Sequence, residues 1–445
     1  MAILLKEISF TQLNKWYVSY YLNPFVIKSK YPLSNLSELI YPSKDRIGKK
    51  EYDGKTPVVS KISFNDGKIH LRSESKTGMD LYRLKPNQLL VSKINFHQGA
   101  VAINKNGDLV CSTHYQPYDI KKGFVNGDFL IGALRSNAFI NFIDNLKAEG
   151  IKNEATYEFI GALKIPLPSI EEQNDIVRKY FFKLNKADAL KYEAEQKENG
   201  VDQFIYNALG IKVDKAVAKE KGLQTVQFKD SIRWAVDYLI GLNSISGLKE
   251  GKYQTVPVRQ FIRSFQYGIS VKATKESVGI PMLRMNNILK GELVTNNLKY
   301  TKLKDTNKKN LLLNKGDLLF NRTNSKELVG KTAVFEEEGE FTFASYIIRL
   351  KLEPSKVDVH YINYLFNSQI GRTQIDMISR QILGQANINS QELQDFVFPI
   401  PPKNIQTEIA SKIRKMKEEI ASLKKEAEEI RKEAKEEFEK KIFNS

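Results

Sequence analysis

The chain contains two copies of one long pattern, and this internal duplication restricts the possible folds more than any other feature of the sequence. The segment PLPSIEEQNDIV begins at Pro166, and the similar segment PIPPKNIQTEIA begins 233 residues later at Pro399. The two segments share three further positions: Pro168 with Pro401, Gln173 with Gln406, and Ile176 with Ile409. Because this period is far too long for a solenoid repeat, the sequence predicts two copies of one domain.

Other blocks recur in the same order, with an offset that drifts from 218 to 233 residues as loop insertions would cause. The pairs are Trp16 with Trp234, the segment from Thr56 with that from Ile280, NQLLVSK from Asn87 with GDLLFNR from Gly316, Gly99 with Gly330, and Tyr115 with Tyr346. The first copy lacks the Gly-Asp turn and the arginine of GDLLFNR. It has Lys93 where the second copy has Arg322.

Each copy is predicted to be an α+β domain. Short apolar runs bounded by Gly, Asn and Asp are typical of strands, and the runs over 127–146 and 358–378 are predicted to be helical. The predicted organisation is a first domain over 1–165, a central helix region over 166–215, a second domain over 216–398 and a C-terminal helix over 399–445.

A long helix is predicted after each Pro-x-Pro segment. Ser169 and Glu172 have the spacing of a capping box, and Asn199-Gly200 predicts a break or kink further on. The last segment has a heptad pattern of Ile409, Ile413, Met416, Ile420, Leu423, Ala427, Ile430 and Ala434. We expect the two helices to pair as an antiparallel coiled coil. The alternative is that each helix packs alone on its own domain.

The charge of the chain indicates a polyanionic partner. The 445 residues carry a formal net charge of +17, which favours nucleic acid. The single cysteine, Cys111, excludes an intramolecular disulfide framework. No apolar run approaches the roughly 18 residues that a membrane helix needs, so we expect no membrane partner and a cytoplasmic location.

No motif for catalysis is evident. The segments GKKEYDGKT and NSKELVGKT lack the glycine spacing of a phosphate-binding loop. The four histidines and Cys111 have no metal-ligand spacing, and no methyltransferase or nuclease motif is present. The sequence therefore predicts a binding component without catalytic residues or a metal. A catalytic subunit with an unfamiliar motif and a coiled-coil scaffold for proteins remain alternatives.

The order of these blocks resembles the specificity subunits of type I restriction-modification systems. The resemblance rests on KPNQLLVSKINFHQGAVAI, IPLPSIEEQNDIV, NKGDLLFNRTNSKELVGKTAVF, QANINSQELQDFVFPIPPKNIQTEIASKI and RWAVDYLI. It implies two target-recognition domains that each read one half of a bipartite site on double-stranded DNA, with the helices setting the spacer. It also implies a role without catalysis in phage defence.

The partners and cofactors also follow from the resemblance. It implies two methyltransferase subunits, which bring S-adenosylmethionine for adenine N6 methylation, and two restriction subunits, which bring ATP and Mg. This chain itself is expected to bind no cofactor. A subunit of the same architecture that serves a methyltransferase-only system or another defence effector is the alternative.

The candidate site residues fall in two groups. Lysine and arginine contact phosphates, whereas arginine, asparagine, serine and threonine also read base edges. The expected DNA-binding residues are Lys44, Arg46, Lys49, Lys50, Lys93, Asn95, His97, Tyr267, Ser270, Lys272, Lys275, Arg284, Asn321, Arg322, Thr323, Asn324 and Lys326. The expected partner-binding positions on the helices are Val177, Tyr180, Leu184, Ile413, Met416 and Ile420.

Overall fold

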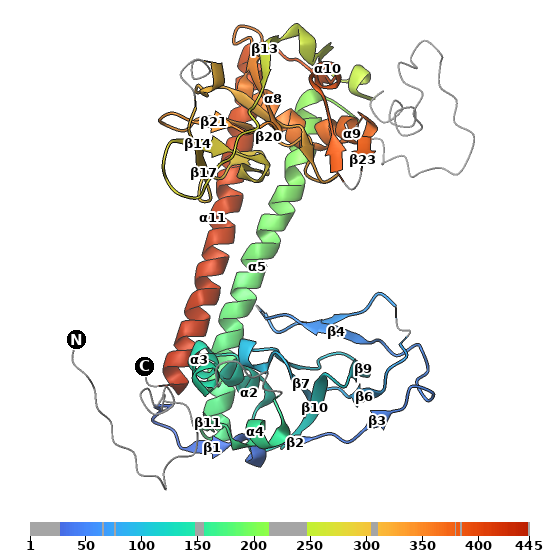
Figure 1. Ribbon diagram of the computed structural model, residues 1–445, viewed down its shortest axis with the longest axis vertical. Helices are drawn as coiled ribbons and strands as arrows, with labels where there is room; N and C mark the ends of the chain where they lie inside the picture. Colours follow the sequence, from blue (N-terminus) through green and yellow to red (C-terminus); the bar gives the residue numbers. More distant parts are fainter. Residues whose placement is uncertain are drawn as a thin grey trace, which may run out of the picture. The chain divides into compact units, whose positions relative to one another are not determined.

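The fold consists of two compact units in a computed structural model that describes residues 27–64, 66–74, 77–146, 155–212, 247–303, 310–378, 380–382 and 385–443 (Figure 1). The first unit is Met1–Lys191 with Lys424–Ser445, and the second is Tyr192–Leu423. The predicted domain boundaries follow strand ends, whereas each compact unit takes in part of both long helices. The predicted pair Trp16 and Trp234 lies outside the described residues.

The first unit is built on an antiparallel sheet in the order β2-β10-β7-β8. These strands are β2 (Ile40–Pro42), β10 (Tyr115–Ile120), β7 (Leu89–Ser92) and β8 (Val101–Ile103). The helices are α2 (Gly127–Leu134), α3 (Asn137–Leu146) and α4 (Tyr157–Ala162), with 3-10 turns η2 (Leu36–Glu38) and η3 (Phe96–Gln98). Smaller sheets contain β1 (Leu33–Asn35) with β11 (Lys164–Pro166), β3 (Arg46–Ile47) with β6 (Leu81–Leu84) and β9 (Leu109–Ser112), and β4 (Val59–Ile62) with β5 (Ile69–Leu71).

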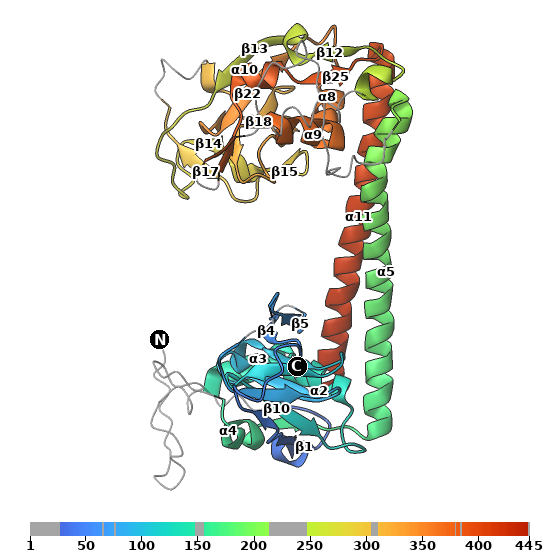
Figure 2. The same cartoon turned by 90° about the vertical axis from the view of Figure 1, so that its right-hand side faces the viewer.

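The second unit repeats this plan with an antiparallel sheet in the order β13-β22-β18-β20 (Figure 2). These strands are β13 (Ile262–Tyr267), β22 (Ile347–Leu352), β18 (Leu318–Asn321) and β20 (Thr332–Val334). The helices are α8 (Val359–Asn367), α9 (Gln369–Ile378) and α10 (Ser390–Gln394), with η5 (Gly247–Glu250), η6 (Val258–Gln260) and η7 (Met285–Asn287). Smaller sheets contain β12 (Thr255–Pro257) with β25 (Val397–Pro399), β14 (Ile280–Leu283) with β17 (Lys299–Thr301) and β21 (Thr342–Phe343), β15 (Ile288–Leu289) with β16 (Glu292–Leu293), and β19 (Thr323–Asn324) with β24 (Gln385–Asn387) and β23 (Arg380–Ile382).

The matching sheet orders confirm the predicted duplication. Each helical run that the sequence predicts as one helix is instead a pair of helices, α2–α3 and α8–α9. The break falls at Ser136 in one copy and at Ser368 in the other. Each serine hydroxyl donates to a carbonyl three residues back, Ala133 at 2.7 Å and Leu365 at 2.8 Å. A serine that bonds the backbone locally competes with continued helix.

A buried glutamine ties the long helix to the sheet domain in both copies. The Gln173 carboxamide accepts from the Asn126 amide at 2.7 Å and donates to the carbonyls of Phe124 and Pro168. Gln406 accepts from the Asp358 amide at 2.9 Å and donates to the carbonyls of Lys356 and Pro401. Both glutamines have no exposed surface. The shared Gln position of the two sequence blocks therefore has a structural cause.

The turn before the central strand is also retained, although its residues differ between the copies. Gly316 has a φ of 85°, and Asn87 has a φ of 66° at the same place before β7. Asn tolerates this left-handed conformation better than most residues. The Asp317 carboxylate accepts from the Asn314 amide at 2.9 Å, and Gln88 accepts from the Lys85 amide at 2.8 Å. Asn-Gln thus forms the turn that Gly-Asp forms in the second copy.

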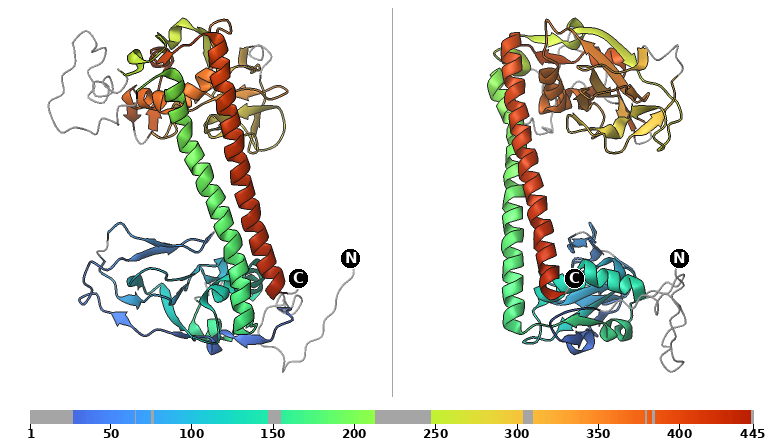
Figure 3. Two further views of the ribbon diagram at one scale, coloured as in Figure 1. Left: turned by 180° about the vertical axis from the view of Figure 1, so that it is seen from behind. Right: turned by 90° about the vertical axis from the view of Figure 1, so that its left-hand side faces the viewer.

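The two long helices are α5 (Ile170–Leu209) and α11 (Lys403–Ile442), each of 40 residues (Figure 3). The predicted capping box is confirmed, since the Ser169 amide donates to Glu172 Oε2 at 3.2 Å and the Glu172 amide donates to Ser169 Oγ at 3.3 Å. Of the break or kink predicted at Asn199-Gly200, the break is wrong, because helix runs through both residues. An internal Gly costs a helix only about 1 kcal/mol, which packing against a neighbouring element offsets.

The helices pair in antiparallel fashion within each unit, as predicted. In the first unit, Lys183 Nζ lies 2.7 Å from Glu437 Oε1, and Arg431 pairs with Asp188. The partner number falls as the α5 number rises, which defines the direction. In the second unit, Lys197 Nζ lies 3.1 Å from Glu419 Oε2. The contact positions include buried alanines, namely Ala187, Ala194, Ala427 and Ala434. Small side chains allow two helix axes to approach closely.

Candidate nucleic-acid interface

The loop that follows β18 begins at Arg322, whose backbone is fixed on both sides. The Arg322 amide donates to the Tyr346 carbonyl at 2.9 Å, and the Arg322 carbonyl accepts from the Ile388 amide at 2.9 Å. The guanidinium carbon lies 5.0 Å from the centre of the Tyr267 ring, in a cation–π arrangement. Its Nε atom is buried and has no hydrogen-bond partner among the described residues. The backbone and the Tyr267 ring together therefore hold the Arg322 side chain in place.

Tyr267 and Arg322 come from two separate segments that the sequence predicts to bind DNA, and the structure brings them together. The Tyr267 hydroxyl donates to Ser390 Oγ and accepts from the Ser390 amide, both at 3.0 Å. Thr323 Oγ1 donates to Asn387 Oδ1 at 2.7 Å, which fixes the next residue of the loop. The result is an ordered arginine–tyrosine pair at the end of the central strand.

The rest of this loop is held by a second arginine, Arg372 of α9. Its Nη1 donates to the Val329 carbonyl at 3.1 Å and its Nη2 to the Lys326 carbonyl at 3.0 Å. The planar guanidinium has a fixed fork of donors, so it fixes the path of the backbone that it grips. Lys326 itself is exposed, and Asn324 is half-buried with its side chain accepting from the Ser325 amide at 2.9 Å.

Two residues of the second copy that the sequence predicts to bind DNA instead form hydrogen bonds to backbone carbonyls within the fold. Asn321 has no exposed surface, and its Nδ2 donates to the carbonyls of Met285 at 3.3 Å and Leu328 at 3.5 Å. It cannot contact DNA in this fold, because it lies inside the sheet. Arg284 is half-buried at the start of η7, and its Nη2 donates to the Asn297 carbonyl at 3.0 Å. The predicted DNA-binding residues that follow Tyr267, namely Ser270, Lys272 and Lys275, are exposed.

Lys93 occupies the same backbone position in the first copy as Arg322 in the second. The Lys93 amide donates to the His114 carbonyl at 2.9 Å, and its carbonyl accepts from the Ala155 amide at 2.8 Å. Lys93 Nζ lies 5.9 Å from the centre of the Tyr82 ring. A cation beside a tyrosine therefore marks the same strand end in both copies.

Arg46 lies at the same tyrosine. Its guanidinium carbon is 4.9 Å from the centre of the Tyr82 ring, and its Nη2 donates to the Tyr82 hydroxyl at 2.6 Å. The structure therefore brings two predicted residues, Arg46 and Lys93, to one ring. Tyr82 was missed from the sequence, because it lies in an ordinary apolar run, LYRL, and nothing in the sequence links it to Lys93. Lys44, Lys49 and Lys50 are exposed.

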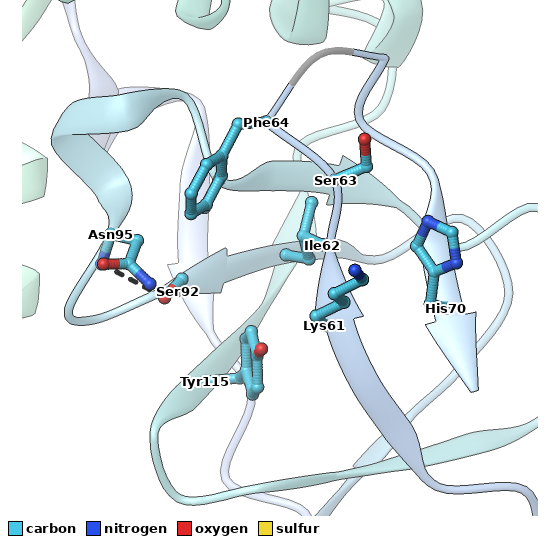
Figure 4. A pocket seen from close by; sticks show the side chains of 9 residues that line it. Lys61, Ile62, Ser63, Phe64, His70, Ser92, Asn95 and Tyr115 are labelled. Carbon is cyan, nitrogen blue, oxygen red and sulfur yellow. Dashed lines mark hydrogen bonds between the residues drawn. The ribbon is translucent and has the colours of Figure 1, made fainter. Parts of the chain in front are cut away.

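Asn95 lies in a pocket of about 290 Å³ in the first unit (Figure 4). The hairpin β4–β5 forms one side of it and the loop after β7 forms the other. The lining side chains include Lys61, Phe64, His70, Ser92, Asn95 and Tyr115. Of these side chains, the sequence predicts only Asn95 as a DNA-binding residue. His97, also predicted, is half-buried in η3 beside this loop.

Three of the six predicted partner-binding positions of the long helices are buried within the chain itself. Val177 is 8% exposed, Ile413 1% and Ile420 7%, and Tyr180 packs against Phe438 with ring centres 5.2 Å apart. Leu184 and Met416 are half-buried. The heptad positions face the neighbouring helix or the attached domain, because that is where apolar surface is removed from water. The exposed aromatic side chains of α5 are Phe181, Phe182 and Tyr192.

A metal site and a membrane-spanning helix are both absent from the part of the chain that the structure describes. No group of three or more His, Cys, Asp and Glu residues with the geometry of a metal site occurs there. Within the same described ranges, no helix has the length and apolar character to cross a membrane. Burial raises the pKa of the Cys111 thiol to about 12, so Cys111 is a core residue and not a reactive thiolate at neutral pH.

Two similar α+β domains, each followed by one long helix, are the architecture of a two-domain specificity subunit. The model of the type I restriction modification DNA specificity domain matches residues 30–197 and 251–432. The chain therefore belongs to this family.

Individual relatives are distant. The chain is 27% identical over 157 residues to the putative type I restriction enzyme MjaX specificity subunit of Methanocaldococcus jannaschii, covering 34% of this chain and 36% of that protein. It is 22% identical over 292 residues to the EcoKI specificity subunit of Escherichia coli, covering 65% and 58%. These matches span less than two thirds of either relative.

Among solved structures, a chain from work on complex assembly and conformational transition of the type I R-M system shares the fold. Its TM-score is 0.55 at 16% identity, and the match covers 93% of this chain and 96% of that chain.

Proposed function

We propose that this chain is the non-catalytic DNA-recognition subunit of a type I restriction-modification complex. Each domain reads one half of a bipartite double-stranded site, and the helix pair sets the spacer. The observation that carries the proposal is the pair Lys93 and Arg322. They share one backbone position and a tyrosine neighbour but differ in chemistry, as expected for two domains that read different half-sites.

The proposed contacts divide by exposure. Arg322 and Thr323 follow a buried strand and are half-buried, which suits base edges, since base contacts require a fixed side chain. The exposed lysines Lys44, Lys49, Lys50, Lys272 and Lys275 suit phosphates. Phosphate contacts make affinity fall steeply with salt. The net charge of +17 supports this part of the proposal.

The partners are also part of the proposal. Two methyltransferase subunits that carry S-adenosylmethionine dock on the long helices, and two restriction subunits bring ATP and Mg. Phe182 and Tyr192 of α5 are 73% and 64% exposed, and aromatic side chains are enriched at protein interfaces. Phe182→Glu should abolish co-purification of the methyltransferase. DNA selection by the chain itself should stay unchanged.

The experiment that tests the DNA-reading role is selection of duplexes from a random library by the full chain. The expected product is a motif of two short halves with a fixed unspecified spacer, and binding that weakens as salt rises. A continuous palindrome would contradict two independent readers. Methylation of the selected duplex by this chain and S-adenosylmethionine alone would instead identify a catalytic subunit. A methyltransferase-only system is distinguished by the absence of DNA cleavage when the complete complex receives ATP.

A further inference from the structure

The first copy has a longer form of a hairpin that is short in the second copy. Strands β4 and β5 form a two-stranded antiparallel ribbon, which stands apart from the four-stranded sheet in Figures 1 and 2. When the segments from Thr56 and Ile280 are paired, Gly67 corresponds to Gly291, and the hairpin β15–β16 at that place has only two residues in each strand. The two copies therefore place hairpins of different length at this position. The ribbon, β4 with β5, is called the hairpin below.

An irregularity in β4 turns specific side chains of the hairpin outward. The register shifts between Val59 and Lys61, which marks a β-bulge. Val59 and Ile62 are both buried, at 1% and 4% exposure, although they are an odd number of positions apart and a regular strand would place them on opposite faces. The extra residue allows both to face the core while Lys61 points away, and bulges are known to re-aim side chains in this manner. Lys61 then pairs with His70 of β5 on the same face.

A half-buried arginine, Arg135, fixes the hairpin against the loop after β7. Arg135 lies between α2 and α3, and its Nη1 donates to the Gly99 carbonyl at 2.6 Å and the Ser63 carbonyl at 3.4 Å. Its Nη2 donates to the Phe64 carbonyl at 2.8 Å. Gly67 has a φ of 72°, and a Cβ there would lie 3.0 Å from the guanidinium. One guanidinium thus joins the hairpin to the loop that begins at Lys93.

The space between these two segments is the pocket of about 290 Å³ shown in Figure 4. Lys61 and His70 enter it from the hairpin, Asn95 enters it from the loop, and Phe64, 48% exposed, forms an aromatic wall. Neither the Lys61 amine nor the His70 imidazole has a hydrogen-bond or salt-bridge partner within the described residues. The pocket therefore combines free donors, a planar apolar surface and a rigid frame.

We infer that the hairpin is a second DNA-reading element of the first copy. It enters the major groove, where Lys61 and His70 donate to acceptor atoms on base edges and Phe64 packs against the bases. The major groove admits a two-stranded ribbon, and lysine bonds the N7 and O6 acceptors of guanine. A histidine ring nitrogen that carries a proton donates to the same acceptors. This inference rests on the proposed DNA-reading function.

The test uses the full chain and the selected duplex, with each purine replaced in turn by its 7-deaza form. This change removes the N7 acceptor, which faces the major groove. The half-site of the first copy is the half that Lys93→Ala relaxes. Wild-type chain should lose about tenfold affinity at one or more positions of that half. Lys61→Ala and His70→Gln should each lower affinity for the unmodified duplex by a similar factor. Each variant should lose no further affinity when the purine that the replaced side chain contacts is changed to its 7-deaza form.

A matched control is Lys68→Ala, because Lys68 is on the same hairpin but pairs with Asp66 at 3.7 Å and does not line the pocket. It should leave the 7-deaza pattern unchanged, and all variants should keep the thermal unfolding midpoint. Wild-type affinity in both pocket variants, or an equal loss on every duplex with a smaller salt dependence, would overturn the inference. If the wild-type chain selects no bipartite duplex at all, the proposed function fails first, which is a separate outcome.

Discussion

The loops after β7 and β18 occupy the same place in the two copies, yet different arginines hold them. In the first copy, Arg135 donates to the Gly99 carbonyl from the α2–α3 junction. The corresponding residue of the second copy is Asn367, which donates to the Thr332 carbonyl at 3.1 Å. There, Arg372 of α9 holds the loop instead. The sheet frame is common to both copies, whereas the support of the reading loops is separate in each.

Two copies of one DNA-binding domain that come to recognise different sequences are expected to differ in this way. Gln173 and Gln406 make the same bonds in both copies because they join each domain to its helix, a task that does not depend on DNA sequence. The loops change together with the residues that fix them. A reading side chain needs a supporting residue to hold its position.

The largest expected effect on stability concerns the two buried glutamines, Gln173 and Gln406, which join each domain to its long helix. Gln173→Ala or Gln406→Ala should lower the unfolding free energy of its own unit by about 3 kcal/mol, because an amide and two carbonyls lose their partner in a buried site. Hydrogen exchange measured segment by segment should show faster opening in the affected unit. The exposed Gln98→Ala and Gln260→Ala serve as controls. A loss in only one of the two copies would contradict their equivalence.

The next effect concerns the strand-end cation. Arg322→Ala should lower affinity for the selected duplex by about tenfold to a hundredfold, because a fixed base contact is lost. Arg322→Lys should recover only part of it, since lysine lacks the fork and stacks less well. Titration of labelled duplex at constant salt measures both. Wild-type affinity of the Arg322→Lys variant would show that charge alone matters. Arg322 and Lys93 would then not differ in how they read DNA.

A smaller effect is expected for the loop support. Arg135→Lys keeps the charge but loses the fork that reaches Gly99 and Phe64 together, so affinity for the first half-site should fall by about fivefold. Mismatches in the second half-site should have the same effect as in wild type. The reciprocal Arg372→Lys should affect only the second half. Binding to duplexes mutated in one half at a time separates the two, and an equal effect on both halves would contradict separate supports.

The smallest effect concerns the turn. Asn87→Gly gives the first copy the turn residue of the second, and the unfolding free energy should change by less than about 1 kcal/mol, since the relief of a positive φ is offset by a more flexible unfolded chain. Asn87→Val should instead destabilise by about 1–2 kcal/mol. Thermal unfolding of the two variants measures the contrast. Equal stability of both would show that the turn is not strained.

The sequence predicted those features that depend on local pattern or on repetition. The capping box at Ser169, the heptad seam of α11 and the paired blocks have their causes within a few residues or recur at a fixed offset. The breaks at Ser136 and Ser368 were missed because the apolar pattern continues through them. The burial of Asn321 depends on carbonyls of Met285 and Leu328, which only the folded chain brings near.

The sequence predicted only those parts of the candidate site that depend on local pattern. Basic loop residues such as Lys93, Arg46 and Arg322 are evident in the sequence, but their tyrosine neighbours come from distant strands. The hairpin pocket requires Lys61, His70 and Asn95 to come together. Arg135 bonds to Gly99, which is 36 residues away in the sequence, and to Phe64, which is 71 residues away. No local pattern specifies such contacts.

The central claim is that each copy reads its own half of one site. The most direct test is duplex selection from a random library by three full chains: wild type, Lys93→Ala and Arg322→Ala. The account predicts that wild type selects two defined halves, that Lys93→Ala relaxes bases in one half only, and that Arg322→Ala relaxes bases in the other. Relaxation of the same half by both variants, or of neither, would contradict it.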